Sequence, residues 1–570
     1  MVHRSKLVGV VCLSAASLAV AACSRDPRIE QRPVVVYAPR SCPVAQDRAF
    51  SVVYAGGDFE PREERPPIAS LFLRDVGTVM GDLPPGTRSL VVDVSQPQPD
   101  VDWRGVAEVP AKGPVNVLVW PGGESCRLSR DVEARTDMAF GVFGRHFLVA
   151  GGRGIEGAQV PNTYVGDLST GIVERLAFGL GTRRAHATVT AFHREEDGEL
   201  TGALVAGGQD PDTGTALATA EIYAPKAGTP GDIGDFDGTR IELSEPRTRH
   251  GAVVLASGET LLVGGLGQSG TPTRLMEIVD PRTGRSRTSG VALLAVPRSR
   301  PTVLRLASGE ILVAGGLDRA GNAVPTLEWF APDASRATKR PIDLVTGRER
   351  AFVPLEAGGA LAVVAPRDDT PDFKTVWVIS AEGTLEPGVP VDPKEIDLVR
   401  LFPGAEGAPV LWTGKRWLRW QPWFGAFQPI AAADDRGPVG EAIATGDSGL
   451  ALWLSEEPGM YVRGFRFATR TRYAGVPKPL LVEGPGQLAP DRLAGLPGSS
   501  IRWQQDRGLE LGPGASAFLT DVTFADFRVE VDVTSSAPVV VLRQEDGREL
   551  DVGGAACAAA QAAARTLVVE

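Results

Sequence analysis

Four copies of one short pattern, an apolar strand-like run that ends in two glycines, limit the fold more than any other feature of the sequence. The first glycines of successive copies are 51 to 57 residues apart. A repeat of about fifty residues that holds several strands is typical of a β-propeller, in which each repeat forms one blade. The sequence therefore predicts an all-β chain with a propeller at its centre. The glycine pairs are Gly151-Gly152, Gly207-Gly208, Gly264-Gly265 and Gly315-Gly316.

The paired glycines have a physical purpose in such a blade. At the crowded end of an inner strand a side chain would collide with the neighbouring blade, and the chain must turn where φ is positive. Each pair should therefore end a blade strand. A further strand should precede each pair, opened by Arg184, Arg249 or Arg300 in the second to fourth copies, and this alignment puts His186 and His250 at equivalent positions.

The copies resemble the kelch repeat of galactose-oxidase-like propellers over roughly residues 131–345. They lack the tryptophan that should follow the turn in that family. Beyond residue 345 the pattern decays, because Ala365 and Pro366 replace the glycines, but strand-like runs continue. At about fifty residues per blade, the available length predicts six or seven kelch-like blades, and seven is our choice.

The oxidase chemistry of that family is not expected in this chain. It requires copper held by tyrosine and histidine, with a tyrosine crosslinked to cysteine, whereas the predicted blades contain no cysteine. The predicted mature chain has only four histidines, and we interpret His186 and His250 as structural; the others are His146 and His193. We predict no metal site, no cofactor and no catalytic residue.

Composition and turn spacing divide the rest of the chain into modules. Short strands separated by Pro, Gly and Asp turns are typical of β-sandwiches. The last module is short for the concanavalin- or laminin-G-like sandwich that it resembles, which suggests a truncated gene or borrowed strands and leaves Cys557 without a partner. The expected modules are a signal peptide (1–22), a tether (23–41), an immunoglobulin-like β-sandwich (42–128), the propeller (131–480) and a partial β-sandwich (485–570).

The first residues resemble a bacterial lipoprotein signal. Arg4 and Lys6 precede an apolar run, 7–20, which is too short to span a bilayer comfortably as a permanent helix. The run ends in the lipobox-like VAAC, so Cys23 is predicted to be lipidated, with palmitate among its chains; an ordinary signal peptide is the alternative. Ser24 rather than aspartate follows, which by the enterobacterial sorting pattern predicts the outer membrane of a bacterial cell envelope.

Two cysteines, Cys42 and Cys126, bound one predicted strand-rich module. In an exported protein they are expected to form a disulfide. Such a bridge would stabilise the fold by roughly 4 kcal/mol through restriction of the unfolded chain. Metal ligation is the rival interpretation, but the sequence offers neither a CxxC motif nor paired histidines beside them.

Three glycine-rich motifs are interpreted as turns. GLGQSG (265–270) fits a dinucleotide-binding pattern, but no helix is predicted after it. GDSG (446–449) resembles a protease nucleophile loop, but the plausible histidine bases belong to distant repeats. DIGDFDGTR (232–240) offers carboxylates, but Ile233 breaks the spacing of a calcium-binding loop. A solvated loop is preferred there, with a bound cation as the alternative.

The densest aromatic cluster contains four tryptophans. Exposed aromatic rings stack on sugars, which would make a glycan site, whereas irregular blades also pack through tryptophan. Packing is the preferred interpretation. The four residues are Trp412, Trp417, Trp420 and Trp423.

The leading functional hypothesis is a lipid-anchored envelope protein that presents its propeller as a scaffold for an envelope protein or a glycan, without catalysis. A formal net charge of −11 without a basic cluster argues against nucleic acid. A carbohydrate-active enzyme is the alternative, and it would need two carboxylates about 5–10 Å apart. A structural assembly lipoprotein without a small ligand is a third possibility.

Recognition is expected on the loops between each glycine pair and the next strand, because loops on a propeller face can diverge while the framework is kept. All four loops should emerge on the same face, where they would form a polar rim. The loops are 153–162, 209–218, 266–274 and 317–325. The candidate rim residues are Asp210, Asp212, Asp318 and Arg319.

Overall fold

The computed structural model of the protein describes most of residues 31–466 and eight short strands beyond them. The expected leader, the lipidation residue Cys23 and Cys557 lie outside the described residues. No helix in the described part of the chain has the length and apolar character needed to cross a membrane. The described ranges are 31–42, 49–57, 69–73, 78–82, 87–95, 103–109, 113–154, 160–193, 201–225, 234–347, 349–355, 358–366, 373–404, 408–422, 425–430, 436–440, 442–445, 450–454, 461–466, 493–495, 501–504, 508–511, 517–519, 529–533, 540–543, 549–552 and 565–569.

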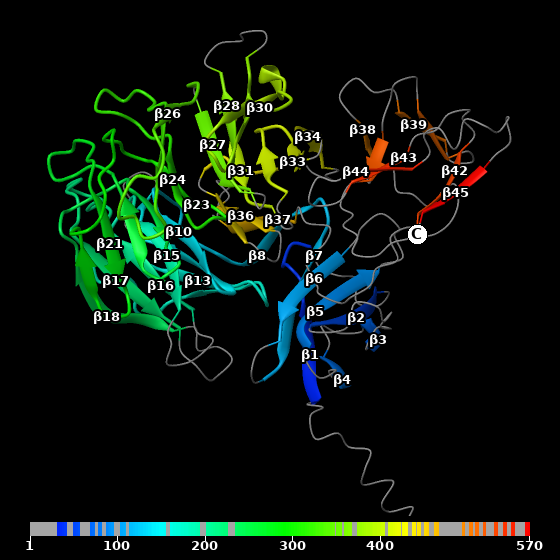
Figure 1. The fold of residues 1–570 in the computed structure, drawn as a ribbon. Helices are drawn as coiled ribbons and strands as arrows, with labels where there is room; N and C mark the ends of the chain where they lie inside the picture. The colour runs from blue at the N-terminus through cyan, green and yellow to red at the C-terminus, as the bar shows by residue number, and fades with distance from the viewer. Residues whose placement is uncertain are drawn as a thin grey trace, which may run out of the picture. The chain divides into compact units, whose positions relative to one another are not determined.

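The N-terminal module joins its described strands in one hydrogen-bonded order, β3-β2-β5-β6-β7-β1-β4 (Figure 1). Its edge strands β3 and β4 contact each other, so the sheet folds over a core. Alternate residues such as Val115, Val117 and Val119 are buried in that core, as the two-residue period of a strand requires. The strands are β1 (Gln31–Tyr37), β2 (Ala49–Gly57), β3 (Ala69–Leu73), β4 (Thr78–Asp82), β5 (Thr87–Ser95), β6 (Trp103–Glu108) and β7 (Val115–Pro121).

Seven four-stranded antiparallel sheets of the described residues form the blades of a β-propeller (Figure 1). This confirms the all-β propeller predicted from the glycine repeat. Blades 1 to 4 each use four strands in chain order. They are blade 1, β10 (Ala139–Phe143), β11 (His146–Ala150), β13 (Tyr164–Asp167) and β14 (Ile172–Arg175); blade 2, β15 (Thr188–His193), β16 (Thr201–Ala206), β17 (Thr219–Ala224) and β18 (Asp235–Glu242); blade 3, β19 (Gly251–Val254), β20 (Thr260–Val263), β21 (Met276–Asp280) and β22 (Arg285–Arg287); and blade 4, β23 (Thr302–Arg305), β24 (Ile311–Ala314), β25 (Thr326–Phe330) and β26 (Ile342–Asp343).

Blades 5 and 6 keep this order, although their sequences have lost the glycine pairs. A short 3-10 turn, η3 (Pro393–Glu395), lies between them. Blade 7 takes three strands from this part of the chain. The strands are blade 5, β27 (Glu349–Pro354), β28 (Ala360–Ala365), β29 (Val376–Ile379) and β30 (Leu385–Pro387); blade 6, β31 (Arg400–Phe402), β32 (Val410–Trp412), β33 (Trp417–Gln421) and β34 (Ala426–Pro429); and blade 7, β35 (Ala442–Thr445), β36 (Leu450–Leu454) and β37 (Tyr461–Arg466).

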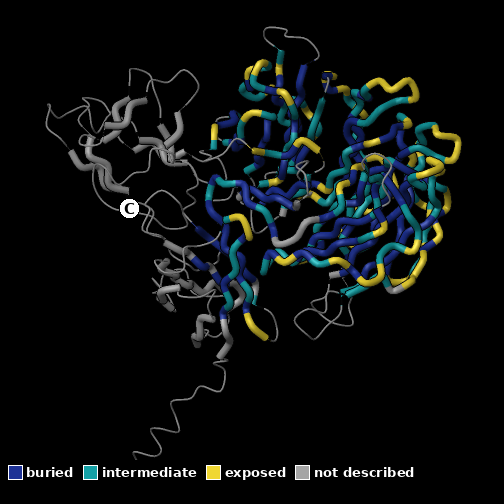
Figure 2. The backbone as a smooth tube through the Cα atoms, turned by 180° about the vertical axis from the view of Figure 1, so that it is seen from behind, coloured by how far each residue is buried: buried dark blue, intermediate teal, exposed yellow. Residues whose placement is uncertain are grey.

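The second strand of each blade is the most deeply buried. Figure 2 shows the buried segments of the chain in dark blue. Every residue of β20, β24, β28 and β36 is buried. These strands are covered on both faces by neighbouring blades, which explains why they read as continuous apolar runs such as TLLV and LALWL rather than as alternating patterns.

The fourth strand of blade 7 comes from the other end of the propeller sequence. β8 (Ser125–Asp131) pairs antiparallel with β37, so that Gly464 faces Cys126 and Phe465 faces Ser125. The ring is thus closed by hydrogen bonds between segments that are far apart in the sequence. This corrects the expected boundary at residue 128, because the propeller begins with β8 and not after it.

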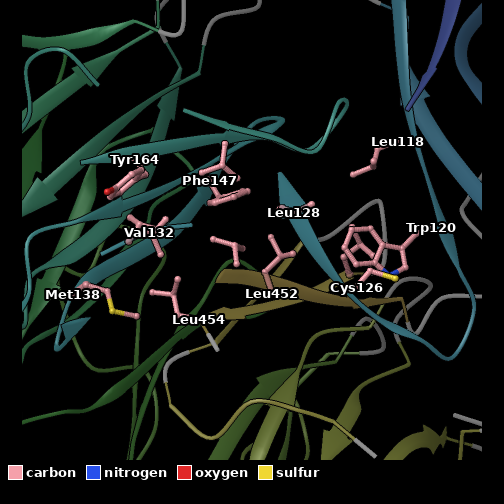
Figure 3. Packing of buried hydrophobic residues seen from close by; sticks show 14 residues of the cluster. Leu118, Trp120, Cys126, Leu128, Val132, Met138, Phe147, Tyr164, Leu452 and Leu454 are labelled. Carbon is pink, nitrogen blue, oxygen red and sulfur yellow. The ribbon is translucent and has the colours of Figure 1, made fainter. Parts of the chain in front are cut away.

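A hydrophobic cluster supports this closure (Figure 3). It contains Trp120 from β7, Leu128 from β8, Phe147 from blade 1 and Leu452 from blade 7, all buried. Because one cluster joins the N-terminal module to the first and last blades, loosening β8 would expose apolar surface on all three of them.

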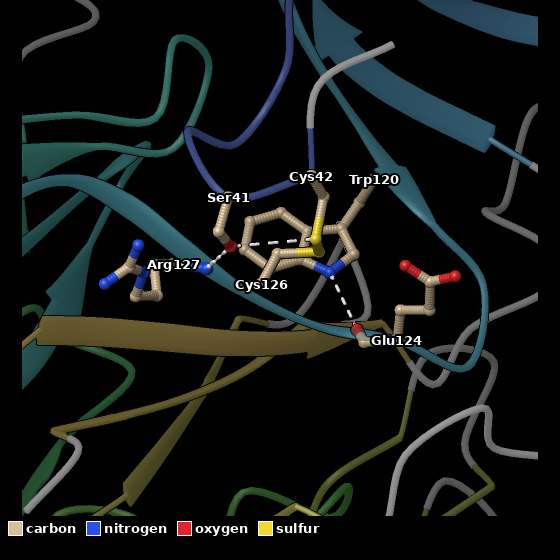
Figure 4. Close-up of a disulfide and its surroundings, with 6 residues drawn as sticks. All are labelled: Ser41, Cys42, Trp120, Glu124, Cys126 and Arg127. Atoms are coloured by element: carbon tan, nitrogen blue, oxygen red, sulfur yellow. Dashed lines mark hydrogen bonds between the residues drawn. A yellow bond between two sulfur atoms is a disulfide. The ribbon is translucent and has the colours of Figure 1, made fainter. Parts of the chain in front are cut away.

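A disulfide adds a covalent link at the same place (Figure 4). The Sγ atoms of Cys42 and Cys126 are 2.06 Å apart, and their Cα atoms are 5.8 Å apart. Next to the bridge, the Arg127 backbone N–H donates to Ser41 Oγ at 2.7 Å. The bridge therefore fastens the closing strand β8 to the segment that follows β1. Glu124 is the third member of a possible metal-ligand group, but its two cysteine partners are bonded to each other.

The second unit of the chain contains the strands beyond residue 479. They form four antiparallel pairs, β38 with β41, β39 with β40, β42 with β45 and β43 with β44. This all-β segment follows the expected change of texture at residue 485. The strands are β38 (Leu493–Gly495), β39 (Ile501–Gln504), β40 (Gly508–Leu511), β41 (Ala517–Leu519), β42 (Val529–Val533), β43 (Val540–Arg543), β44 (Glu549–Val552) and β45 (Arg565–Val569).

Candidate binding site at the propeller axis

The glycine pairs end the second strands of blades 1 to 4, and each pair makes a junction with the next blade. All eight glycines have positive φ, between 58° and 98°. A Cβ atom on Gly151 would lie 2.1 Å from the Arg184 carbonyl oxygen, and one on Gly264 would lie 2.5 Å from the Arg298 carbonyl oxygen. The second glycine, for example Gly265, donates its N–H to the same arginine carbonyl, at 2.9 Å. Only glycine combines this turn with this close approach.

A buried arginine in each of blades 1 to 4 holds the glycine pair of its own blade. In blade 3, Arg247 donates to Glu277 at 2.7 Å and also to the Gly264 carbonyl at 3.4 Å. The Glu277 carboxylate in turn accepts the Ser244 N–H at 2.6 Å. Both side chains are at most 1% exposed. Blades 2 and 4 repeat this arrangement with the pairs Arg184–Glu221 and Arg298–Glu328.

In blade 1 a different set of residues holds the glycine pair. Arg135 donates to the Gly151 carbonyl at 2.9 Å and pairs with Glu133 at 2.7 Å. Tyr164 occupies the strand position that glutamate has in the other three blades, and the Arg135 guanidinium lies 5.4 Å from its ring centre. Burial lowers the pKa of Arg135, while Glu133 raises it.

The structure corrects the expected alignment of the copies. The strand registers make Arg247 and Arg298, not Arg249 and Arg300, equivalent to Arg184. His186 is then equivalent to Arg249, and His250 is one position further along its blade. Sequence reasoning missed these buried arginine–glutamate pairs. The signal was present, because a glutamate recurs 13 or 14 residues after the first glycine in AEIY, MEIV and LEWF.

The first strand of each blade is its inner strand, the one nearest the propeller axis. In blades 1 to 4, the residue two positions before this strand begins to pair with the second strand faces the axis, and we call these residues the ring positions. In blades 1 to 4 they hold Asp137, His186, Arg249 and Arg300, all with φ between 51° and 57°. Backbone hydrogen bonds link them in sequence: His186 N–H to Asp137 O at 2.7 Å, Arg249 N–H to His186 O at 3.4 Å and Arg300 N–H to Arg249 O at 2.7 Å. Four blades thus bring four charged or polar side chains into one arc.

The side chains of this arc are also linked. Arg249 Nη2 lies 3.1 Å from His186 Nε2, and Asp137 Oδ1 lies 3.3 Å from His186 Nδ1. Because arginine can only donate, Nε2 accepts and the imidazole proton is on Nδ1, which points to Asp137. Burial lowers the pKa of His186 to about 4; Asp137 opposes this shift, and Arg249, Arg300 and Arg153 add to it. The imidazole is therefore neutral at pH 7.

The arc carries an excess of positive charge. Arg153 joins it from β12 (Arg153–Gly154), where it pairs with Thr136 of β9 (Arg135–Thr136), the residue before Asp137. The Nε atoms of Arg153 and Arg249 are buried without a hydrogen-bond partner among the described residues. Arg300 is exposed, and no described residue pairs with its guanidinium. Three guanidinium groups and one carboxylate thus meet at this end of the axis, which we call the axial mouth.

A cavity of about 600 Å³ lies among the first strands of the blades, beside the ring positions. Its first lining residues, Met138 and Ala187, directly follow the ring residues Asp137 and His186. Deeper parts of the lining come from the inner strands of blades 1, 2, 3, 6 and 7. The wall is mixed, because apolar side chains alternate with Thr188, Arg400 and exposed backbone; the other lining residues are Phe140, Val189, Ala252, Gly440, Ala442 and Ile443.

The predicted rim loops follow the same ends of the inner strands. Isolated β-bridges hold the two ends of a loop together, as between Leu266 and Pro272 and between Leu317 and Ala323. Equivalent strand ends put these loops on the face that carries the axial mouth. Residues 155–159 of the first loop lie outside the described part.

Two rim carboxylates have structural partners inside their own loops. Asp210 accepts the backbone N–H of Thr213 at 2.7 Å, and Asp318 accepts that of Asn322 at 2.8 Å. These hydrogen bonds lower the pKa of both carboxyl groups. Asp212 pairs with Arg183 at 2.7 Å. Arg319 is exposed, so of the four rim residues it is the one most available to a partner.

The structure also shows where most of the other sequence motifs lie. Trp412, Trp417 and Trp420 are at most 3% exposed, which supports packing and removes them as a sugar-stacking surface; Trp423 lies outside the described residues. His250 is buried and bonds Thr188 Oγ1 at 2.9 Å. GLGQSG forms a bridge and turn without a helix, and β18 begins at Asp235, inside the proposed cation loop. GDSG (446–449) is not described.

Comparisons with known proteins do not assign the chain to a family. No family model and no curated protein sequence matches the chain. One similar solved structure, titled "Structure of YjhT", is 11% identical with a TM-score of 0.32, and the match covers 52% of this chain and 94% of that one. At this level of likeness, the propeller assignment comes from the seven sheets themselves.

Proposed function

We propose that the protein is a lipid-anchored binding protein of a bacterial cell envelope that recognises its partner with the loop-bearing end of the propeller. The observation that carries the proposal is the contrast between the two parts of the blades. The strands are buried and engaged in packing, whereas one end combines exposed loops with an arc of charged side chains that have unused hydrogen-bonding groups. Exposed polar groups on a rigid scaffold are the usual place for recognition.

The proposed anchor rests on the sequence VAAC that ends at Cys23. Several acyl chains on one residue hold a protein stably at a membrane. Replacing Cys23 with Ser should move the protein from the detergent phase to the aqueous phase of a Triton X-114 partition. Continued partition of this variant into detergent would mean that another feature anchors the protein.

Recognition can be tested with the soluble chain from residue 24, using a glycan array and capture of envelope proteins with identification by mass spectrometry. Arg319→Ala and Asp212→Ala should weaken binding of the captured partner without changing the melting temperature by more than about 2 °C, since exposed substitutions cost little. Glu242→Gln, on the outer strand β18, is the matched control. Equal binding by all three variants would place recognition elsewhere.

The alternative of a carbohydrate-active enzyme is less well supported by the axial mouth. A glycosidase needs two carboxylates on either side of the bond that it cleaves. In blades 1 to 4 the ring positions supply the carboxylate of Asp137, which faces His186; in blade 5 the equivalent Glu349 accepts the Val399 N–H at 2.8 Å, so both carboxylates already have partners. Hydrolysis of a glycan by the purified protein, lost in Asp137→Asn, would nevertheless establish this alternative.

A further inference from the structure

The axial mouth has the composition of an anion site in a protein of opposite overall charge. The chain has a formal net charge of −11, yet three guanidinium groups and one carboxylate gather at the mouth. The single carboxylate, Asp137, faces His186 Nδ1 at 3.3 Å, so it is already engaged. The positive charges therefore lack an equal number of negative partners among the described residues.

The arginines are held in place at a conformational cost. Arg249 and Arg300 have φ of 53° and 51°, a region that side chains other than glycine rarely adopt. Such a strained conformation persists only where the surrounding structure imposes it. Here the backbone hydrogen bonds between successive blades impose it, and they point the side chains of neighbouring blades toward one another.

Arg249 is oriented further by its neutral partner. His186 Nε2 accepts from Arg249 Nη2, and this leaves the buried Nε of Arg249 without a described partner. Arg153 also has a buried, unpartnered Nε. A guanidinium group donates in a planar fork that matches the oxygens of a carboxylate or a phosphate. The Arg300 guanidinium is exposed, so an anion in the mouth can reach it, and Arg249 and Arg153 add positive charge beside it.

We propose, resting on the assignment of this end as the recognition face, that the axial mouth binds the oxyanion head of a small amphipathic ligand through Arg153, Arg249 and Arg300. The uncharged body of the ligand enters the axial cavity. The cavity, of about 600 Å³, has room for such a body, and its wall offers Met138, Phe140 and Val189 for apolar contact beside the polar side chains Thr188 and Arg400. Carboxylate and phosphate heads share this chemistry.

The proposal is tested by calorimetric titration of the purified protein with five probes at low ionic strength. Phenyl phosphate and benzoate carry a head and a body, inorganic phosphate and acetate carry the head alone, and benzyl alcohol carries the body alone. We expect binding of phenyl phosphate or benzoate, weaker binding of the matching small ion and no binding of benzyl alcohol. The stronger of the two aromatic anions identifies the head group.

Substitutions at the mouth decide which residues bind. Arg300→Gln and Arg249→Gln should each weaken binding of the aromatic anion by about 10- to 100-fold, which is the usual contribution of a charge-assisted hydrogen bond. Arg285→Gln, on the exposed outer strand β22 of blade 3, is the matched control and should bind as the unchanged protein does. If Arg249→Gln fails to fold, Arg300→Gln decides, because Arg300 is exposed and lacks a described side-chain partner.

Several results would overturn the proposal. Equal binding by Arg300→Gln and the unchanged protein would show that the arginines do not bind the anion. Binding of benzyl alcohol as tight as that of benzoate would show that the charge of the ligand does not contribute. Binding of inorganic phosphate as tight as that of phenyl phosphate would show that the cavity does not bind the body of the ligand. If no anion binds while an envelope partner is still captured through the rim, this inference fails and the proposed function stands. Failure of both measurements would reject both.

Discussion

In blades 1 to 4, each blade holds its own glycine pair through an arginine that is no more than 1% exposed, and in blades 1 to 3 the second glycine also donates its N–H to a carbonyl of the next blade. In blades 5 to 7 the same architecture is held by apolar packing, which between blades 6 and 7 uses large aromatic side chains. Trp417 stacks on Phe465 with ring centres 4.3 Å apart, and Trp412 and Trp453 pack against it. Gly315 marks the change, because a Cβ there would meet Phe352 of blade 5 rather than an arginine carbonyl.

The comparison teaches that closing a propeller and using it make different demands on the sequence. Polar junctions need specific residues at specific places, so the first four blades repeat visibly, and they deliver charged side chains to the axis. Aromatic packing needs only volume and shape, so the last three blades can vary freely in sequence. In blade 5 the equivalent position holds Glu349, whose carboxylate accepts the Val399 N–H of blade 6 at 2.8 Å, and blade 6 holds Leu398 there.

The aromatic half is tested first by Trp417→Ala. Loss of a fully buried tryptophan costs about 3–5 kcal/mol in unfolding free energy, because it leaves a cavity. Trp417 is 1% exposed and contacts rings from blades 6 and 7. Urea denaturation followed by tryptophan fluorescence and circular dichroism measures the loss. A loss below about 1 kcal/mol would show that this interface is not held by the cluster.

The polar half is tested by Glu277→Leu, which leaves Arg247 buried without its partner. Removing one member of a buried ion pair costs about 3–5 kcal/mol, whereas replacing both members with apolar residues is often neutral. The double variant Arg247→Met/Glu277→Leu should therefore recover most of the stability in urea denaturation. Glu242→Gln, from an exposed pair with Arg240, is the control and should change stability by less than about 0.5 kcal/mol. Failure of the double variant to recover would mean that the carboxylate has a further role, such as its bond to Ser244.

The glycine junctions are tested by comparing Gly264→Ala with Gly270→Ala. Both glycines have positive φ, 59° and 68°, but a Cβ at 264 would lie 2.5 Å from a carbonyl oxygen, while nothing lies within 4 Å at 270. Backbone strain alone should cost about 1 kcal/mol at 270, and the clash should raise the cost at 264 to about 3 kcal/mol. Thermal denaturation measures the difference. Equal losses would mean that the junction relaxes without cost.

Acid should weaken the polar half through His250. Burial, followed by the charge of Arg247, lowers the pKa of His250 to about 3, so the unfolded chain takes up this proton first as the pH falls below 6.5. The stabilising effect is complete above pH 6.5 and is lost progressively down to about pH 3. The slope is about 1.4 kcal/mol per pH unit for this group. His250→Gln should remove that part of the pH dependence between pH 6 and 5. A parallel slope in the variant would contradict the assignment.

How much of the fold and of the candidate site could be predicted from the sequence also differs between the first four blades and the rest. The glycine pairs predicted a propeller because their requirement for positive φ is visible in single residues. The pairing of β8 with β37 could not be predicted, because it joins strands roughly 330 residues apart and leaves no local pattern. The axial mouth was missed for another reason. Its residues are ordinary arginines and one histidine until the strand registers bring Asp137, His186, Arg249 and Arg300 side by side.

The central claim is that recognition belongs to the first four blades and closure to the last three. Hydrogen–deuterium exchange of the purified protein, with and without saturating phenyl phosphate, tests it most directly. We predict slower exchange in peptides that contain the ring positions of blades 1 to 4, near residues 137, 186, 249 and 300, and unchanged exchange around 398–402 and 461–466. Protection centred on blades 5 to 7, or no protection near the four ring positions while phenyl phosphate is bound, would contradict the account.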